Sequence, residues 1–177
     1  MPIDVTLLLD ASGSVEGQHL ERLKRGIVET AQLLRPEDRV RLVAVQHSVF
    51  QVFPFQPGGS SPSVDRLSGM GGTSLFDGLS AALIQASVPD RRQLVIAYTD
   101  GHDTTSVLTA ATVREVAGFS DAVLHFVVPS AGAKNQPAGT TQTLAELATT
   151  TDPNLVFDLR AKLDATNIKG RLAWAGA

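Results

Sequence analysis

The sequence predicts an α/β protein with a doubly wound, mostly parallel central sheet, one antiparallel edge strand and helices on both faces. Apolar runs of strand length alternate along the chain with segments in which apolar residues recur every three or four positions. One pair of neighbouring strand-like segments interrupts this alternation and indicates a hairpin. We therefore expect the order β-α-β-β-α-β-α-β-α-β-α, with the carboxyl ends of the parallel strands at one edge.

The first strand-like run, residues 3–10, is the one around which the sheet is expected to form. Leu7, Leu8 and Leu9 follow one another without a polar residue, which is typical of a strand buried on both faces in the middle of a parallel sheet. Asp10 ends this run abruptly. Ligands of open α/β sheets bind at the carboxyl ends of the strands, so Asp10 is a candidate site residue.

A helix and a hairpin are expected next. Apolar residues spaced by three and four positions predict an amphipathic helix over about residues 16–34, which Pro36 prevents from continuing. Residues 39–45 and 50–55 are strand-like and are separated by only four residues, which indicates an antiparallel pair. Pro54 in the second of these strands favours a place at the sheet edge.

The second half of the chain continues the alternation. A glycine-rich loop leads into a helix from Leu75 to about Ala86, for which Thr73 or Ser74 would serve as the N-cap. The remaining expected elements are strands at 93–100, 122–128 and 154–158, helices at 107–117, 144–148 and 160–174, and a loop at 129–139.

Composition limits the class of protein. The chain has 177 residues, 43% hydrophobic and 19% charged, which fits one globular α/β domain with a sizeable core. A net charge of -3 argues against nucleic acid or an anionic membrane surface as the main partner. The absence of cysteine excludes disulfides, thiolate metal sites and a cysteine nucleophile.

The compartment is not determined by the sequence. No apolar run approaches the roughly 20 residues that span a bilayer. The first strand begins at residue 3 and leaves no room for a signal peptide. We expect residues 1–177 to form a single domain. It would be extracytoplasmic or secreted if it is cut from a longer chain, the interpretation we favour, and cytoplasmic otherwise.

Three segments of the chain bring oxygen donors to the predicted sheet edge: Asp10, Ser12 and Ser14 after the first strand, Thr73 after the glycine loop, and Asp100 after a later strand. Carboxylate and hydroxyl oxygens suit Mg²⁺, Mn²⁺ or Ca²⁺ better than Zn²⁺ or Cu²⁺. Two carboxylates balance the formal charge of a dication, but five oxygen donors leave one position of an octahedral ion open. A group from outside the chain, or water, would fill that position.

These residues resemble the motifs of von Willebrand factor A domains and integrin inserted domains. Asp10-Ala11-Ser12-Gly13-Ser14 matches the family's Asp-x-Ser-x-Ser motif, Gly71-Gly72-Thr73 its threonine segment, and Thr99-Asp100-Gly101 its second aspartate. The resemblance implies a metal-ion-dependent adhesion site, usually holding Mg²⁺.

By this resemblance, Ser12 and Ser14 would coordinate the ion directly, and Asp10, Thr73 and Asp100 directly or through water. A glutamate or aspartate of a partner protein would take the sixth position. The resemblance therefore implies a non-catalytic protein-interaction module without direct contact to nucleic acid or membrane.

Simpler roles compete with metal binding at several positions. Ser12 or Ser14 could cap the following helix. Asp103 and His102 could support the site, although solvated loop residues are the simpler interpretation. Asp77 in the first turn of its helix would favour the helix dipole. The remaining histidines are too far apart for ligand spacing; they are His19, His47 and His125.

Two other functions stay open. An acid at a strand end could be the nucleophile of a phosphotransferase, but haloacid-dehalogenase-like enzymes carry a second acid two residues later, where this chain has Ser12. Neither a Gly-x-Ser-x-Gly elbow nor a phosphate-binding Gly-x-x-x-x-Gly-Lys loop occurs. The domain could also be the recruiting subunit of a larger, chelatase-type assembly.

Overall fold

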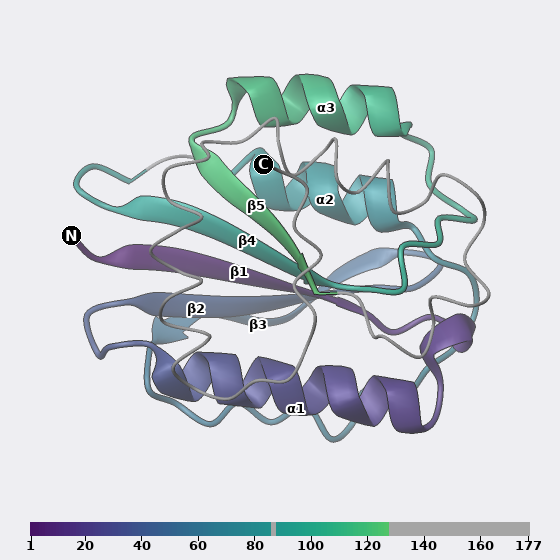
Figure 1. Cartoon of the computed structure of the whole chain (residues 1–177), viewed down its shortest axis with the longest axis horizontal. Helices are drawn as coiled ribbons and strands as arrows, with labels where there is room; N and C mark the ends of the chain where they lie inside the picture. Colours follow the sequence, from purple (N-terminus) through teal and green to yellow (C-terminus); the bar gives the residue numbers. More distant parts are fainter. Residues whose placement is uncertain (86–87, 128–177) are drawn as a thin grey trace, which may run out of the picture.

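The computed structural model describes residues 1–85 and 88–127 (Figure 1). Its elements are β1 (Ile3–Asp10), the short 3-10 helix η1 (Gly13–Val15), α1 (Gln18–Leu33), β2 (Arg39–Val45), β3 (Val49–Pro57), α2 (Leu75–Leu83), β4 (Arg92–Tyr98), α3 (Ala110–Phe119) and β5 (Ala122–Val127). The elements expected at 129–139, 144–148, 154–158 and 160–174 lie outside the described residues.

The described strands form one sheet in the order β3-β2-β1-β4-β5. β1 pairs in parallel with β2 and β4, and β4 pairs in parallel with β5. β2 and β3 are antiparallel, and β3 lies at the edge. The predicted fold class is thus confirmed. β1 is central, and its residues from Asp4 to Asp10 are all buried, as the uninterrupted leucine run predicted.

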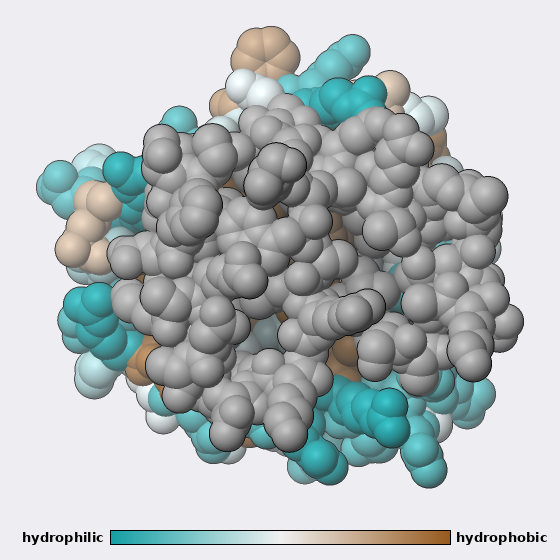
Figure 2. Space-filling model, in the orientation of Figure 1, coloured by the Kyte–Doolittle hydropathy of each residue, from teal (hydrophilic) through white to brown (hydrophobic). Residues whose placement is uncertain are grey.

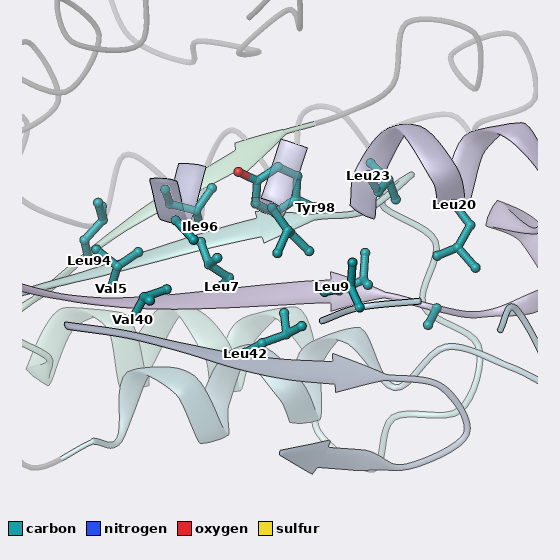
Figure 3. Close-up of a cluster of buried hydrophobic side chains, with 14 of the residues drawn as sticks. Val5, Leu7, Leu9, Leu20, Leu23, Val40, Leu42, Leu94, Ile96 and Tyr98 are labelled. Atoms are coloured by element: carbon teal, nitrogen blue, oxygen red, sulfur yellow. The ribbon is translucent and has the colours of Figure 1, made fainter. Parts of the chain in front are cut away.

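Helices cover both faces of the sheet, with α1 on one face and α2 and α3 on the other (Figure 1). Side chains alternate along β1, so that Leu7 and Leu9 pack toward α1 while Leu8 packs toward α2. The α1 side of the core joins residues of β1, β2, β4 and α1 (Figure 3). On this side the Thr30 and Tyr98 hydroxyls form a buried hydrogen bond of 2.6 Å. Burial raises the pKa of Tyr98 to about 12.

The edge strand β3 is irregular. Its pairing with β2 shifts register between Val40 and Leu42 and again between Leu42 and Val43. Pro54 lies in this stretch and is exposed. Proline lacks a backbone N–H and is tolerated only at an edge or a bulge, so the position expected from the sequence is confirmed.

Helix boundaries differ from those predicted. α1 begins at Gln18, because Gly17 has φ 74°, a left-handed conformation outside a right-handed helix. α2 ends at Leu83, three residues earlier than expected. Ser74 occupies the N-cap position of α2, but its side chain makes no capping bond. α3 begins at Ala110 because Thr109 caps it, accepting a hydrogen bond from the Thr112 amide.

The surface is mostly polar where the described residues are visible. Hydrophilic side chains predominate around the grey region, with hydrophobic residues exposed in small groups (Figure 2). None of the described helices is long and apolar enough to cross a membrane.

Candidate metal centre

Three chain segments meet where β1 and β4 end. Residues 70–71 lie against the segment that follows β1, because the Met70 amide donates to the Ala11 carbonyl at 3.0 Å and the Gly13 amide to the Gly71 carbonyl at 3.1 Å. The segment that follows β4 lies on the other side, since β4 is the parallel neighbour of β1. The right-hand side of Figure 1 shows this edge.

Asp10 is the most enclosed of the candidate residues, with none of its surface exposed. One carboxylate oxygen, Oδ1, accepts from the Ser12 hydroxyl at 2.6 Å and from the Ser12 amide at 3.0 Å. The other, Oδ2, accepts from the Thr99 hydroxyl at 2.7 Å. Burial raises the pKa of Asp10, these hydrogen bonds oppose the shift, and the charge of Asp100 adds to it. The two carboxylates are therefore within electrostatic reach of each other.

Ser12 and Ser14 extend this group toward solvent. Ser12 is buried and Ser14 is exposed, and their hydroxyl oxygens lie 3.1 Å apart. Because Ser12 gives its single proton to Asp10, Ser14 is the donor in this pair. Adjacent ligands of an octahedral Mg²⁺ at 2.0–2.1 Å lie about 2.9 Å apart. The oxygen spacing therefore fits two neighbouring positions around such an ion.

Thr73 is held by the loop that follows β4. Its amide donates to the Thr104 hydroxyl at 2.8 Å, and its carbonyl accepts from the Thr104 and Thr105 amides at 2.9 and 3.1 Å. Only 2% of Thr73 is exposed. A Cβ at Gly72 would lie 2.6 Å from a Thr105 methyl carbon and 2.8 Å from the Thr104 hydroxyl, so no side chain fits there.

Asp100 lies at the start of the same loop and is buried. Its Oδ1 accepts from the His102 amide at 3.0 Å, and its Oδ2 lies 3.9 Å from Nδ1 of His102. The structure thus joins Asp10 to Ser12 and Ser12 to Ser14 by hydrogen bonds. The charge of Asp100 acts on Asp10, and main-chain bonds join Thr73 to the loop that begins with Asp100. The role of these five residues as ligands stays a prediction.

Two residues that support this edge were not identified from the sequence. Thr99 bonds Asp10 and also accepts from the Gly101 amide at 2.9 Å. Gln46, at the end of β2, donates to the carbonyls of Ala11 at 3.1 Å and Ser68 at 2.9 Å. Its own carbonyl accepts from the Ser74 amide at 2.7 Å. The available signal was a polar residue directly after an apolar strand run, the same signal that marked Asp10.

The neighbouring acids have structural partners. Asp103 is a half-buried loop residue, and its Oδ2 accepts from the Phe76 amide in the first turn of α2 at 2.9 Å. Asp77 lies in that first turn, as predicted. Its carboxylate accepts from the amides of Val107 at 3.0 Å and Leu108 at 2.9 Å.

No group of three histidine, cysteine, aspartate or glutamate residues that could hold a metal occurs in the part of the chain that the structure describes. Among the histidines, His125 lies on β5, where burial lowers its pKa. The candidate centre instead combines two carboxylates with hydroxyls, a donor set suited to Mg²⁺ or Ca²⁺.

Comparison with known proteins gives a family match over most of the chain. The model of the von Willebrand factor type A domain matches residues 4–169. An uncharacterized protein of Synechocystis sp., sll0103, is 29% identical over 109 residues, which cover 58% of this chain and 26% of that protein. The chain therefore spans about a quarter of the length of the curated relative it matches.

Solved structures give the same picture of the fold. The SpRpn10 VWA domain is similar with a TM-score of 0.65 and 13% identity, over 100% of this chain and 99% of that one. Proximal thread matrix protein 1 of the mussel byssus has a TM-score of 0.67 at 15% identity, covering 85% and 43% of the two chains. BatB of Bacteroides thetaiotaomicron has 0.60 at 15% identity, covering 92% and 98%. At such identities the likeness shows the fold alone.

Proposed function

Because the chain belongs to the von Willebrand factor type A domain family, we propose that it is a protein-interaction module that binds a partner's carboxylate through a divalent cation. The ion is Mg²⁺ by preference, with Mn²⁺ or Ca²⁺ as substitutes. Asp10, Ser12, Ser14, Thr73 and Asp100 hold it. The partner is a protein that supplies a glutamate or aspartate.

The observation that carries the proposal is the environment of Asp10. This carboxylate is fully buried, it accepts hydrogen bonds from hydroxyls and an amide, and a second carboxylate raises its pKa further. A buried ionised carboxylate is costly unless a positive charge compensates it. A cation at the Ser12 and Ser14 hydroxyls would provide that compensation at the point where the group opens to solvent.

The residues of the chain would have different roles in holding the ion. Asp10 supplies negative charge from its buried position, and Ser12 and Ser14 supply neutral oxygens beside it. Thr99 orients the Asp10 carboxylate through its hydroxyl. Where Asp10 and Asp100 act through water, the oxygens that contact the ion directly would be neutral, and an anionic side chain of a partner would be favoured at the open position. Partner binding would then depend on both the metal and the partner's carboxylate.

We propose further that the module is not an enzyme. The Ser12 and Thr99 hydroxyls donate to Asp10, and neither is paired with a histidine, among the residues of known position, as a serine nucleophile would be. Asp10 itself is enclosed by these hydroxyls, whereas an attacking carboxylate needs access to its substrate.

Isothermal titration calorimetry with Mg²⁺ and Mn²⁺ tests the proposal on the wild type and Asp10→Ala. We expect one ion per chain in the wild type and none in the variant. Asp121→Ala removes an equal charge from an exposed position before β5 and should bind like the wild type. Unchanged affinity in Asp10→Ala would show that the ion binds elsewhere.

A second titration includes acetate or a glutamate peptide. If the partner's carboxylate is needed to complete the site, metal binding should tighten with either anion. The absence of binding by the folded wild type under all of these conditions would refute metal-dependent recognition.

A further inference from the structure

The loop between β4 and α3 both accepts hydrogen bonds from the first turn of α2 and donates hydrogen bonds to it. Asp103 lies at the centre of these bonds. We propose that Asp103 is a positioning residue of the candidate metal site. It fastens the 102–106 loop to α2 and thereby sets the position of Thr73. The inference rests on the proposed function, since it assigns Asp103 an effect on metal affinity.

Asp103 takes the place of the missing N-cap of α2. The side chain of Ser74 makes no capping bond, and its hydroxyl instead lies 2.9 Å from that of Thr105. The Phe76 amide donates to Asp103 Oδ2 at 2.9 Å. The Asp77 amide donates to the Ser106 hydroxyl at 3.2 Å. The first amides of a helix have no partner within it and carry partial positive charge, so a carboxylate here is favourable.

Ser106 also holds Asp103 in place. Its hydroxyl donates to Asp103 Oδ2 at 2.5 Å, and its amide donates to Asp103 Oδ1 at 3.3 Å. In the opposite direction, the Asp77 carboxylate accepts hydrogen bonds from the Val107 and Leu108 amides at the far end of the loop. The loop and the helix start therefore satisfy each other's polar groups.

The consequence for the site follows from the residue next to Asp103. Thr104 bonds both main-chain groups of Thr73. At Gly72 the main chain packs closely on the Thr104 and Thr105 side chains, so Thr73 cannot approach the loop further, and the main-chain bonds oppose its movement away. Because the same loop begins with Asp100, one short segment both carries one proposed ligand and holds another. Loosening the loop at Asp103 should move Thr73 relative to Asp10.

A competing explanation is that Asp103 acts only as an additional negative charge that attracts a cation. The two explanations differ in their dependence on Thr73. A positioning role requires the Thr73 side chain, so it should disappear once that side chain is removed. A long-range charge effect should persist in its absence.

The test measures Mn²⁺ affinity by calorimetry in the wild type, Asp103→Ala, Thr73→Ala and the double variant. We expect Asp103→Ala to weaken binding about tenfold in the wild-type background, as loss of a supporting partner commonly does, and less than about twofold in the Thr73→Ala background. Equal effects in both backgrounds, or no effect in either, would overturn the proposal. Asp121→Ala is the charge-matched control and should bind like the wild type.

A measurement without metal separates this inference from the proposed function. Hydrogen exchange of the Thr73 amide, in the presence of a chelator, should be at least about tenfold faster in Asp103→Ala, while the Leu8 amide in β1 keeps its protection. Unchanged protection at Thr73 would refute the positioning role even if metal binds. If the wild type binds no metal but Thr73 protection falls, the proposed function fails while the structural link stands.

If Asp103→Ala does not fold, Ser106→Ala is tested in its place. It removes the hydroxyl that joins Asp103 to the Asp77 amide and leaves the carboxylate and its charge in place. We expect a smaller loss of Mn²⁺ affinity, about threefold, in the same direction. Because no charge changes, such a loss supports the positioning role, and unchanged affinity together with unchanged Thr73 protection contradicts it.

Discussion

Two aspartates on the same side of β1 have opposite surroundings. Asp4, at the amino end, is 4% exposed and is bonded by two arginines. Its Oδ1 accepts from Nε of Arg39 at 2.9 Å and from Nε of Arg91 at 2.6 Å. Asp10, at the carboxyl end, is surrounded by hydroxyls and by the charge of Asp100. A buried acid that is already neutralised by cations stabilises the fold, whereas one that lacks this compensation is available for a ligand.

The pKa values of the two residues express the same difference. Burial raises the pKa of Asp4, but the hydrogen bonds and charges of Arg39 and Arg91 outweigh it and hold the pKa below 3.8. Burial also raises the pKa of Asp10, and hydroxyl donors do not reverse the shift. One strand thus carries a stabilising carboxylate at one end and a destabilised one at the other.

The largest expected effect on stability comes from a substitution of Asp4, at the amino end of β1. Asp4→Asn should lower the free energy of unfolding by about 3 kcal/mol, because it leaves two partly buried guanidinium groups without their counter-charge. Urea unfolding near pH 7 in the presence of a chelator measures this loss. Asp10→Asn is the matched substitution and should cost far less. If the two variants lost equal stability, the contrast between the two ends would be wrong.

The contribution of Asp4 to the free energy of unfolding should decrease gradually as the pH is lowered. Since the folded-state pKa lies below 3.8, the contribution of Asp4 is fully present above that pH and is lost as the pH falls through the folded-state value. The difference in unfolding free energy between wild type and Asp4→Asn should therefore shrink as the pH is lowered below 3.8. A difference that stayed constant to about pH 2 would show that the arginines do not hold the charged form.

The stabilisation by bound metal should depend on Asp10, at the carboxyl end of β1, and not on Asp4. At one hundred times the dissociation constant, Mg²⁺ should raise the unfolding free energy of the wild type and of Asp4→Asn by about 2.7 kcal/mol. Asp10→Asn should gain nothing. Thermal or urea unfolding with and without Mg²⁺ measures the three values, and a gain in Asp10→Asn would place the ion at another site.

The smallest expected effect concerns the support of Asp10. Thr99→Val keeps the shape of the side chain but removes the hydroxyl bonded to Oδ2, and should weaken Mn²⁺ binding about tenfold. Thr30→Val is its control, since it removes a buried hydroxyl bond to Tyr98 on the α1 side. Both should lose about 1 kcal/mol of stability. Calorimetry should show reduced affinity only in Thr99→Val; equal affinities would mean that Thr99 only stabilises the fold.

The sequence was sufficient for the parts of the molecule that depend on local pattern. Leu7, Leu8 and Leu9 identified the central strand, and Pro54 identified the edge strand. The acids that follow two of the apolar runs, Asp10 and Asp100, marked the end of the sheet where the candidate site lies. These features depend on properties of residues that are adjacent in the sequence, such as the burial of an apolar run or the lack of a backbone N–H in proline. Such preferences can be read without knowing which strands pair.

The remaining features depend on contacts between distant residues. Asp4 meets Arg39 because the parallel register of β1 and β2 places them opposite each other, and no local pattern specifies that register. Asp103 caps a helix that begins 28 positions earlier, at Leu75, so its position in a polar loop gave no indication of a partner. The bonds that hold residues 107–108 to Asp77 also join distant parts of the chain, and they occupy the first residues of the segment in which α3 was expected to begin.

The irregular strand β3 has a consequence for the behaviour of the protein in concentrated solution. An outer strand with a regular row of backbone donors and acceptors can template a strand of another molecule and begin aggregation. Here Pro54 removes one donor from that row, and two register shifts bend its path. Among the described strands, the outer border formed by β3 is therefore poorly suited to the addition of a strand from another molecule.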